Sequence, residues 1–105
     1  MNSIIKAILD AKRDSWKATF QAAESAMQDP RVPARTRQAA RDAVYLLDNP
    51  TDDIEADIVS IFDYAGDCAA ALKYIGYRAV DGQPSAIGQL QGIRSYINRK
   101  HLIVI

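Results

Sequence analysis

Hydrophobic residues recur every three or four positions along four stretches of this chain, and this spacing predicts amphipathic helices. The clearest pattern spans residues 49–72, where aspartates occupy the side of the helical wheel opposite the hydrophobic residues. Its hydrophobic side consists of Ile54, Ile58, Ile61, Phe62, Ala65, Ala69 and Leu72. We expect this helix to pack its hydrophobic side into a core and to leave a concentrated acidic side exposed.

The four stretches predict an all-α fold, namely a compact single domain that resembles a four-helix bundle. The expected helices span residues 4–28, 33–47, 49–75 and 83–100. A short hydrophobic tail, residues 102–105, follows the last helix. Two alternatives are open for this tail: it folds back onto the bundle, or it binds a partner as an extended strand.

Capping residues, proline and glycine set the expected helix ends. Ser3 and Asn49 are the expected N-caps of the first and third helices, and Pro33 is the expected first residue of the second helix. The third helix ends just before Gly76, or it continues to Val80.

Two residues depart from the simple pattern of the helices. Gly66 lies inside the third helix, and a close helix crossing would compensate for its low helix propensity. Lys12 falls on the hydrophobic side of the first helix, so we expect its amine to reach solvent or a carboxylate of the third helix. The expected core consists of Ile5, Ile8, Leu9, Trp16, Phe20, Val44, Leu47, Ile58, Ile61, Phe62, Leu72, Leu90, Ile93 and Ile97.

The net charge of the 105 residues is zero, but the charges are segregated along the chain. Residues 1–50, 51–81 and 82–105 carry net charges of +2, −5 and +3. Zero net charge disfavours general affinity for nucleic acid, whereas separate patches permit a local electrostatic interface.

Several features favour a cytoplasmic protein. The single cysteine, Cys68, excludes an internal disulfide. The amino terminus lacks the pattern of a signal peptide, and no hydrophobic run reaches the roughly 18 residues of a membrane span.

The acidic side of the third helix is the preferred candidate for a partner-binding surface. Its candidate residues are Asp53, Asp57, Asp63, Tyr64 and Asp67. Aspartates one turn apart can share a hard cation, but the histidines of di-metal bundles are missing, so we expect no metal and no cofactor. The chain also has five tyrosines, which mostly fall outside the core positions and are common in protein interfaces.

A basic patch around the second helix is the alternative candidate, and it consists of Arg31, Arg35, Arg37 and Arg41. Guanidinium groups bind phosphates and carboxylates through paired hydrogen bonds. This patch therefore keeps open a nucleic-acid-binding regulator as the alternative function.

The chain lacks a recognisable catalytic constellation, because its one histidine, His101, and Cys68 belong to no motif. We therefore expect a non-enzymatic module that binds another protein, a larger enzyme or complex, and covers its functional surface. In size and architecture such a module is similar to stoichiometric inhibitors and anti-defence proteins, including anti-CRISPR proteins. Self-association through residues 102–105 is a further alternative.

Overall fold

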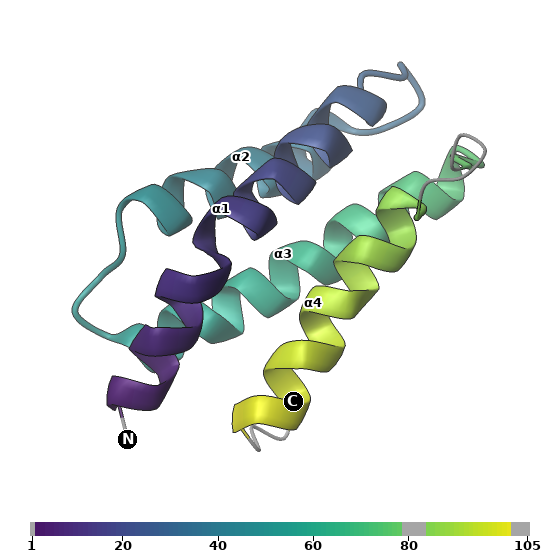
Figure 1. Ribbon diagram of the computed structural model, residues 1–105. Coiled ribbons are helices and arrows are strands. Elements are labelled where there is room, and N and C mark those ends of the chain that lie inside the picture. Colours follow the sequence, from purple (N-terminus) through teal and green to yellow (C-terminus); the bar gives the residue numbers. More distant parts are fainter. Residues whose placement is uncertain (1, 79–83, 102–105) are drawn as a thin grey trace.

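Four α-helices form an all-α, bundle-like fold, which confirms the predicted fold class (Figure 1). The computed structural model describes residues 2–78 and 84–101, which contain no strand. The helices are α1 (Asn2–Ala26), α2 (Ala34–Asp48), α3 (Ile54–Tyr74) and α4 (Ala86–His101). The predicted hydrophobic tail, residues 102–105, lies outside the described residues.

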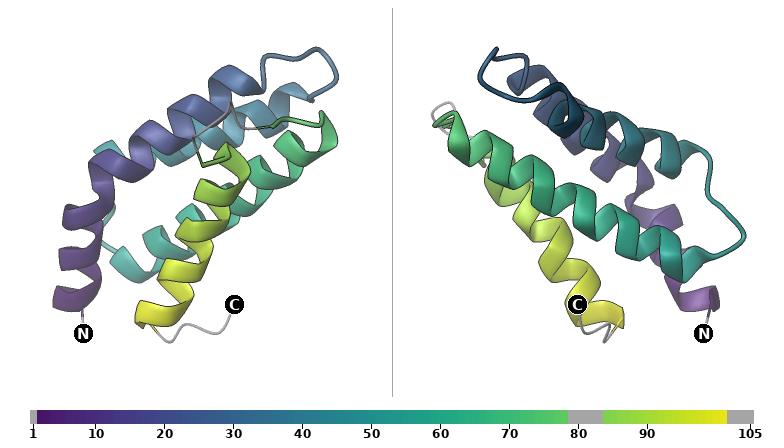
Figure 2. Two further views of the ribbon diagram at one scale, coloured as in Figure 1. Left: turned by 45° about the vertical axis from the view of Figure 1, so that its right-hand side comes forward. Right: turned by 180° about the vertical axis from the view of Figure 1, so that it is seen from behind.

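The helix α3 occupies the centre of the arrangement. It packs against α1, α2 and α4, whereas α2 and α4 do not touch each other within the described residues. Figure 2 shows α2 and α3 side by side and running in opposite directions. The N-terminal end of α2 therefore lies beside the C-terminal end of α3, and both helices keep one side toward solvent.

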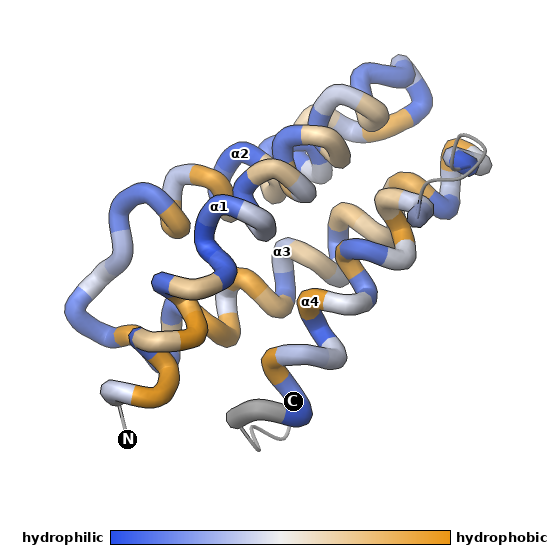
Figure 3. The backbone as a smooth tube through the Cα atoms, in the orientation of Figure 1, coloured by the Kyte–Doolittle hydropathy of each residue, from blue (hydrophilic) through white to orange (hydrophobic). Residues whose placement is uncertain are grey.

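The core is built from one side of each helix, as the spacing predicts. Hydrophobic and hydrophilic positions follow one another along every helix in Figure 3. Two residues of the expected core, Ile8 and Val44, are only half-buried, because they lie at its edge. The largest fully buried side chains are Phe20, Met27, Leu47, Ile58, Ile61, Leu72, Leu90 and Ile97.

The helix α3 begins later than its sequence predicts. Its N-cap is Asp53, whose carboxylate accepts a hydrogen bond from the backbone N–H of Ala56 at 3.1 Å. The prediction of Asn49 as the N-cap was wrong. The Thr51 hydroxyl donates to the carboxylate of Asp57 and accepts from the backbone N–H of Asp53, and these hydrogen bonds hold the segment before α3 as a loop.

The C-terminal end of α3 confirms the prediction that the helix stops before Gly76. Gly76 has a φ of 72°, a conformation that glycine adopts without steric cost. The backbone N–H of Tyr77 donates to the carbonyl of Leu72 at 3.0 Å, and that of Gly76 donates to Lys73 at 3.1 Å. This is the Schellman arrangement, and it excludes a continuous helix to Val80.

The first two helices also differ slightly from the predicted ends. Ser3 lies inside α1 and is not its N-cap, because α1 already begins at Asn2. Pro33 occupies the N-cap position of α2 and not its first helical position. Proline suits both places, since neither requires its missing N–H to join the helical hydrogen bonds.

Cations lie on aromatic rings at two places where helices meet α4. Nζ of Lys12 is 4.9 Å from the ring centre of Tyr96, so this amine crosses to α4 and not to a carboxylate of α3. The guanidinium of Arg94 lies 4.6 Å from the ring centre of Phe62 and also covers Gly66. A side chain, and not a close backbone crossing, therefore fills the space beside Gly66.

Candidate functional site

The outer seam between α2 and α3 brings together residues of both predicted patches, namely Arg35, Tyr64 and Asp67, and we call it the α2–α3 seam. Its α2 positions recur at three- and four-residue steps, so they share one side of that helix, and the same holds for α3. The seam consists of Arg35, Gln38, Asp42, Tyr45, Ser60, Tyr64, Asp67, Ala71 and Tyr74.

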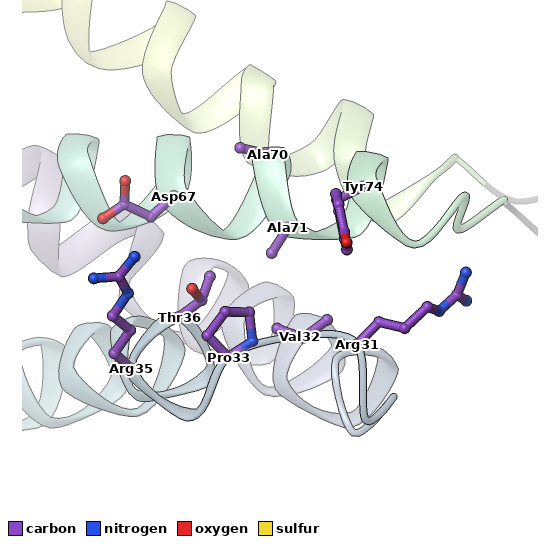
Figure 4. Close-up of a pocket in the computed structure, with 9 residues that line it drawn as sticks. All are labelled: Arg31, Val32, Pro33, Arg35, Thr36, Asp67, Ala70, Ala71 and Tyr74. Atoms are coloured by element: carbon purple, nitrogen blue, oxygen red, sulfur yellow. The ribbon is translucent and has the colours of Figure 1, made fainter.

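A groove of about 610 Å³ lies at one end of the seam, and we call it the arginine groove (Figure 4). Its floor is hydrophobic and includes Val32 and Ala71. Figure 4 shows the guanidinium of Arg35 and the carboxylate of Asp67 facing each other across the groove. The ring of Tyr74 borders it and is 70% exposed.

A second groove, of about 410 Å³, lies at the other end of the seam, and we call it the tyrosine groove. Asp42 and Tyr45 line it from α2, and Ser60 and Tyr64 line it from α3. Tyr45 is 68% exposed, whereas Tyr64 is half-buried.

Negatively charged side chains surround the Tyr64 hydroxyl of the tyrosine groove. Burial raises the pKa of the Tyr64 hydroxyl, and the charges of Asp42, Asp63 and Asp67 raise that pKa further. Carboxylates have this effect because a phenolate beside them is repelled. A positively charged group is therefore favoured at the same place.

Asp57 does not belong to the exposed acidic side, so its placement there by the sequence pattern was wrong. Only 3% of the residue is exposed. One carboxylate oxygen accepts the backbone N–H of Thr51 at 2.8 Å, and the other accepts the Thr51 hydroxyl at 2.5 Å. The loop before α3 is thus held against Asp57, which makes this aspartate a structural residue.

The other predicted acidic residues are exposed. Asp53 caps α3 through its own carboxylate, as described above. Asp63 and Asp67 form no hydrogen bond or ion pair with the described residues. On the side away from α2, they line a shallow hollow together with Arg94. The structure therefore keeps Asp63, Tyr64 and Asp67 together, and it separates Asp53 from them.

The predicted basic patch is largely engaged in contacts within the chain. Nη1 of Arg37 donates to the carbonyl of Val32 at 2.9 Å, and Nε of Arg41 pairs with Glu24 at 2.5 Å.

The remaining two arginines border the arginine groove. Arg31 pairs with Asp29 at 2.8 Å and lowers the pKa of that carboxyl to about 2 through a side-chain hydrogen bond. Arg35 makes no hydrogen bond or ion pair within the described part of the chain. Its guanidinium is therefore the one most open to a ligand among the four.

Some residues of the seam were not among the predicted site residues. The abundance of tyrosines outside the core positions already pointed to Tyr45 and Tyr74, but no sequence pattern distinguished them from the other tyrosines. Asp42 carried no signal, because a single acidic residue on an exposed helix side is common. Its importance arises only from its position opposite Tyr64.

The single cysteine of the sequence, Cys68, is shielded from solvent. Cys68 is fully buried, and burial raises the pKa of its thiol to about 12, with a smaller contribution from the charge of Asp67. The thiol is therefore protonated at neutral pH, whereas a nucleophilic cysteine requires the thiolate. Cys68 acts as a small packing residue in the core.

Two structural features are absent from the described residues. They contain no group of three or more histidine, cysteine, aspartate or glutamate side chains placed to hold a metal ion. None of their helices combines the length and the hydrophobicity that crossing a membrane requires.

Comparisons of the chain with protein family models, with curated proteins and with solved structures find no match. Its own residues therefore carry the functional argument.

Proposed function

We propose that this protein is a non-enzymatic binding module that recognises another protein through the α2–α3 seam. The exposure of two large aromatic side chains on one seam carries this proposal. Tyr45 is 68% exposed and Tyr74 is 70% exposed, and each borders a groove. Tyrosine is enriched in interfaces because it buries a large area and loses little rotamer freedom.

The polar residues of the seam suit recognition of a protein. Asp67 and Arg35 place opposite charges on the two sides of the arginine groove. Such an arrangement selects partners by charge as well as by shape. A standard interface needs about 800 Å² from each partner. This is roughly an eighth of the accessible surface of 6403 Å², so one side of the bundle is large enough.

The proposed mechanism is occlusion, in which the seam covers a functional surface of a larger enzyme or complex. Stoichiometric inhibition of this kind, as in anti-defence proteins, requires no catalytic group on the inhibitor. The buried, protonated thiol of Cys68 agrees with such a role. A reducing cytoplasm is the proposed compartment, because the chain has a single cysteine.

Nucleic-acid binding through the basic patch has less support. Arg31, Arg37 and Arg41 are already engaged by acceptors of the same chain. Breaking these contacts would offset part of the gain from contacts to phosphates. A gel shift with duplex DNA and with RNA tests this alternative: salt-sensitive binding that Arg35→Glu abolishes would support it.

The proposal is tested by affinity capture from a lysate of the source organism, with the wild-type chain and two variants as baits. The variant Tyr45→Ala/Tyr74→Ala removes both exposed rings of the seam. The control Ile4→Ala removes a side chain of α1 that is 62% exposed and lines neither groove of the seam.

We expect a protein that the wild type and Ile4→Ala retain in stoichiometric amounts and that the seam variant loses. All three baits should melt at similar temperatures, because surface substitutions change stability little. An identical set of captured proteins with all three folded baits would overturn the proposal.

A further inference from the structure

We propose that the tyrosine groove receives an arginine side chain of the partner, with its guanidinium stacked on Tyr45 or Tyr64 and paired with the carboxylate of Asp42. This inference rests on the proposed function and names the chemistry that the partner presents. The groove is formed by both helices of the seam, so a side chain inserted there contacts α2 and α3 together.

The first argument is that the groove offers an acceptor for a cation. Asp42 has one hydrogen-bond partner among the described residues, the side-chain amide of Gln38 at 3.0 Å, which occupies one of its two oxygens. No lysine or arginine among the described residues lines the groove. The second carboxylate oxygen therefore has no cation of the described residues paired with it.

The second argument is the surrounding charge. Asp42, Asp63 and Asp67 all act on the Tyr64 hydroxyl, and each raises its pKa. Asp57 also lines the groove, but both of its carboxylate oxygens already accept hydrogen bonds from Thr51. Asp42 and Asp57 line the groove itself, and within the described part of the chain no lysine or arginine lines it. This acidic lining is the complement of a basic side chain.

The third argument is the presence of aromatic rings beside the carboxylate. A guanidinium is planar and weakly hydrated, so it stacks on a ring while its N–H groups bind a carboxylate. The ammonium of lysine is more strongly hydrated and lacks this planar fork. The combination of tyrosine and aspartate therefore favours arginine.

The fold already uses such contacts inside the bundle. Arg94 lies 4.6 Å from the ring centre of Phe62, and Lys12 lies 4.9 Å from that of Tyr96. A guanidinium in the tyrosine groove would make the same kind of contact with the ring of Tyr45, which is largely exposed.

The test uses N-acetyl-arginine methylamide as the probe, titrated into the isotope-labelled full chain and followed by the amide resonances in NMR. N-acetyl-citrulline methylamide is the matched neutral probe, because it has nearly the same shape without the charge. We expect the arginine probe to shift the resonances of Asp42, Tyr45, Ser60 and Tyr64, and the citrulline probe to leave them nearly unchanged.

Two protein variants make the test specific. Asp42→Asn removes the charge but keeps an oxygen for Gln38, and it should weaken binding of the arginine probe about fivefold. Asp14→Asn removes an exposed charge of α1 and should leave the affinity unchanged.

Three results would overturn the inference: equal shifts with the citrulline probe, shifts centred outside the tyrosine groove, or equal affinity of N-acetyl-lysine methylamide. Its failure is distinguishable from that of the proposed function. If Tyr45→Ala/Tyr74→Ala loses the captured partner while the arginine probe does not bind, the protein-binding function stands and the arginine inference is wrong. If the probe binds as expected and that variant retains every captured protein, the groove binds guanidinium but the seam is not the docking surface.

Discussion

Replacing Asp57 by alanine separates a structural role of this residue from a role in binding. The carboxylate accepts two hydrogen bonds from Thr51, at 2.8 and 2.5 Å. A hydrogen bond to a charged group contributes about 1.5–3 kcal/mol. Because Thr51 is itself exposed, water replaces part of each lost bond, and we expect Asp57→Ala to lower the free energy of unfolding by about 3 kcal/mol.

Asp57→Asn should cost less, about 1–2 kcal/mol, because the amide oxygen still accepts the backbone N–H of Thr51. The assay is urea denaturation followed by circular dichroism. Asp63→Ala is the matched control on the same helix, since this exposed aspartate makes no hydrogen bond within the described residues. Its substitution should change stability by less than about 0.5 kcal/mol.

A double-mutant cycle with Thr51→Val tests the contact itself. The two substitutions should be non-additive by about 1–2 kcal/mol, because each removes the same hydroxyl–carboxylate hydrogen bond. Additive effects, or a wild-type urea midpoint for Asp57→Ala, would refute the reasoning. If Asp57→Asn folds but loses the captured partner while the seam is intact, Asp57 has a binding role after all.

Further predictions concern glycine, cysteine and the Asp29–Arg31 pair. Gly66→Ala should raise the free energy of unfolding by about 0.5–1 kcal/mol, because the added methyl group meets a guanidinium at 3.6 Å, an ordinary contact distance. Gly76→Ala should lower it by about 1–2 kcal/mol, since φ there is 72°; urea denaturation showing the same sign for both would contradict this. Cys68, with a pKa of about 12, should react with iodoacetamide far more slowly in the native protein than in the urea-unfolded chain, and equal rates would count against its burial. In an NMR titration the carboxyl of Asp29 should have a pKa of about 2, and Arg31→Gln should return it toward 3.8. Because the folded-state pKa is lowered, the stabilising contribution of this pair is present above the unfolded-state pKa and is lost as the pH falls from about 4 toward 2. A wild-type value near 3.8 would show that the pair does not form in solution.

The sequence by itself determined the helical fold and most of the core. Hydrophobic spacing is a property of a helix relative to its own axis, so Ile58, Ile61 and Leu72 could be assigned to the buried side without knowledge of their neighbours. The end of α3 before Gly76 could also be predicted from the local sequence, since a Schellman motif involves only consecutive residues.

The tertiary structure alone decided which polar residues remain available at the surface. A helical wheel places Asp57 beside other aspartates, but the loop that covers it comes from outside the helix. Arg41 looks like a free cation until α1 brings Glu24 against it. The meeting of Asp42 and Tyr45 with Tyr64 likewise depends on how α2 packs against α3. Periodicity along one helix contains no information about the side chains of another helix, and the candidate site therefore emerged only from packing.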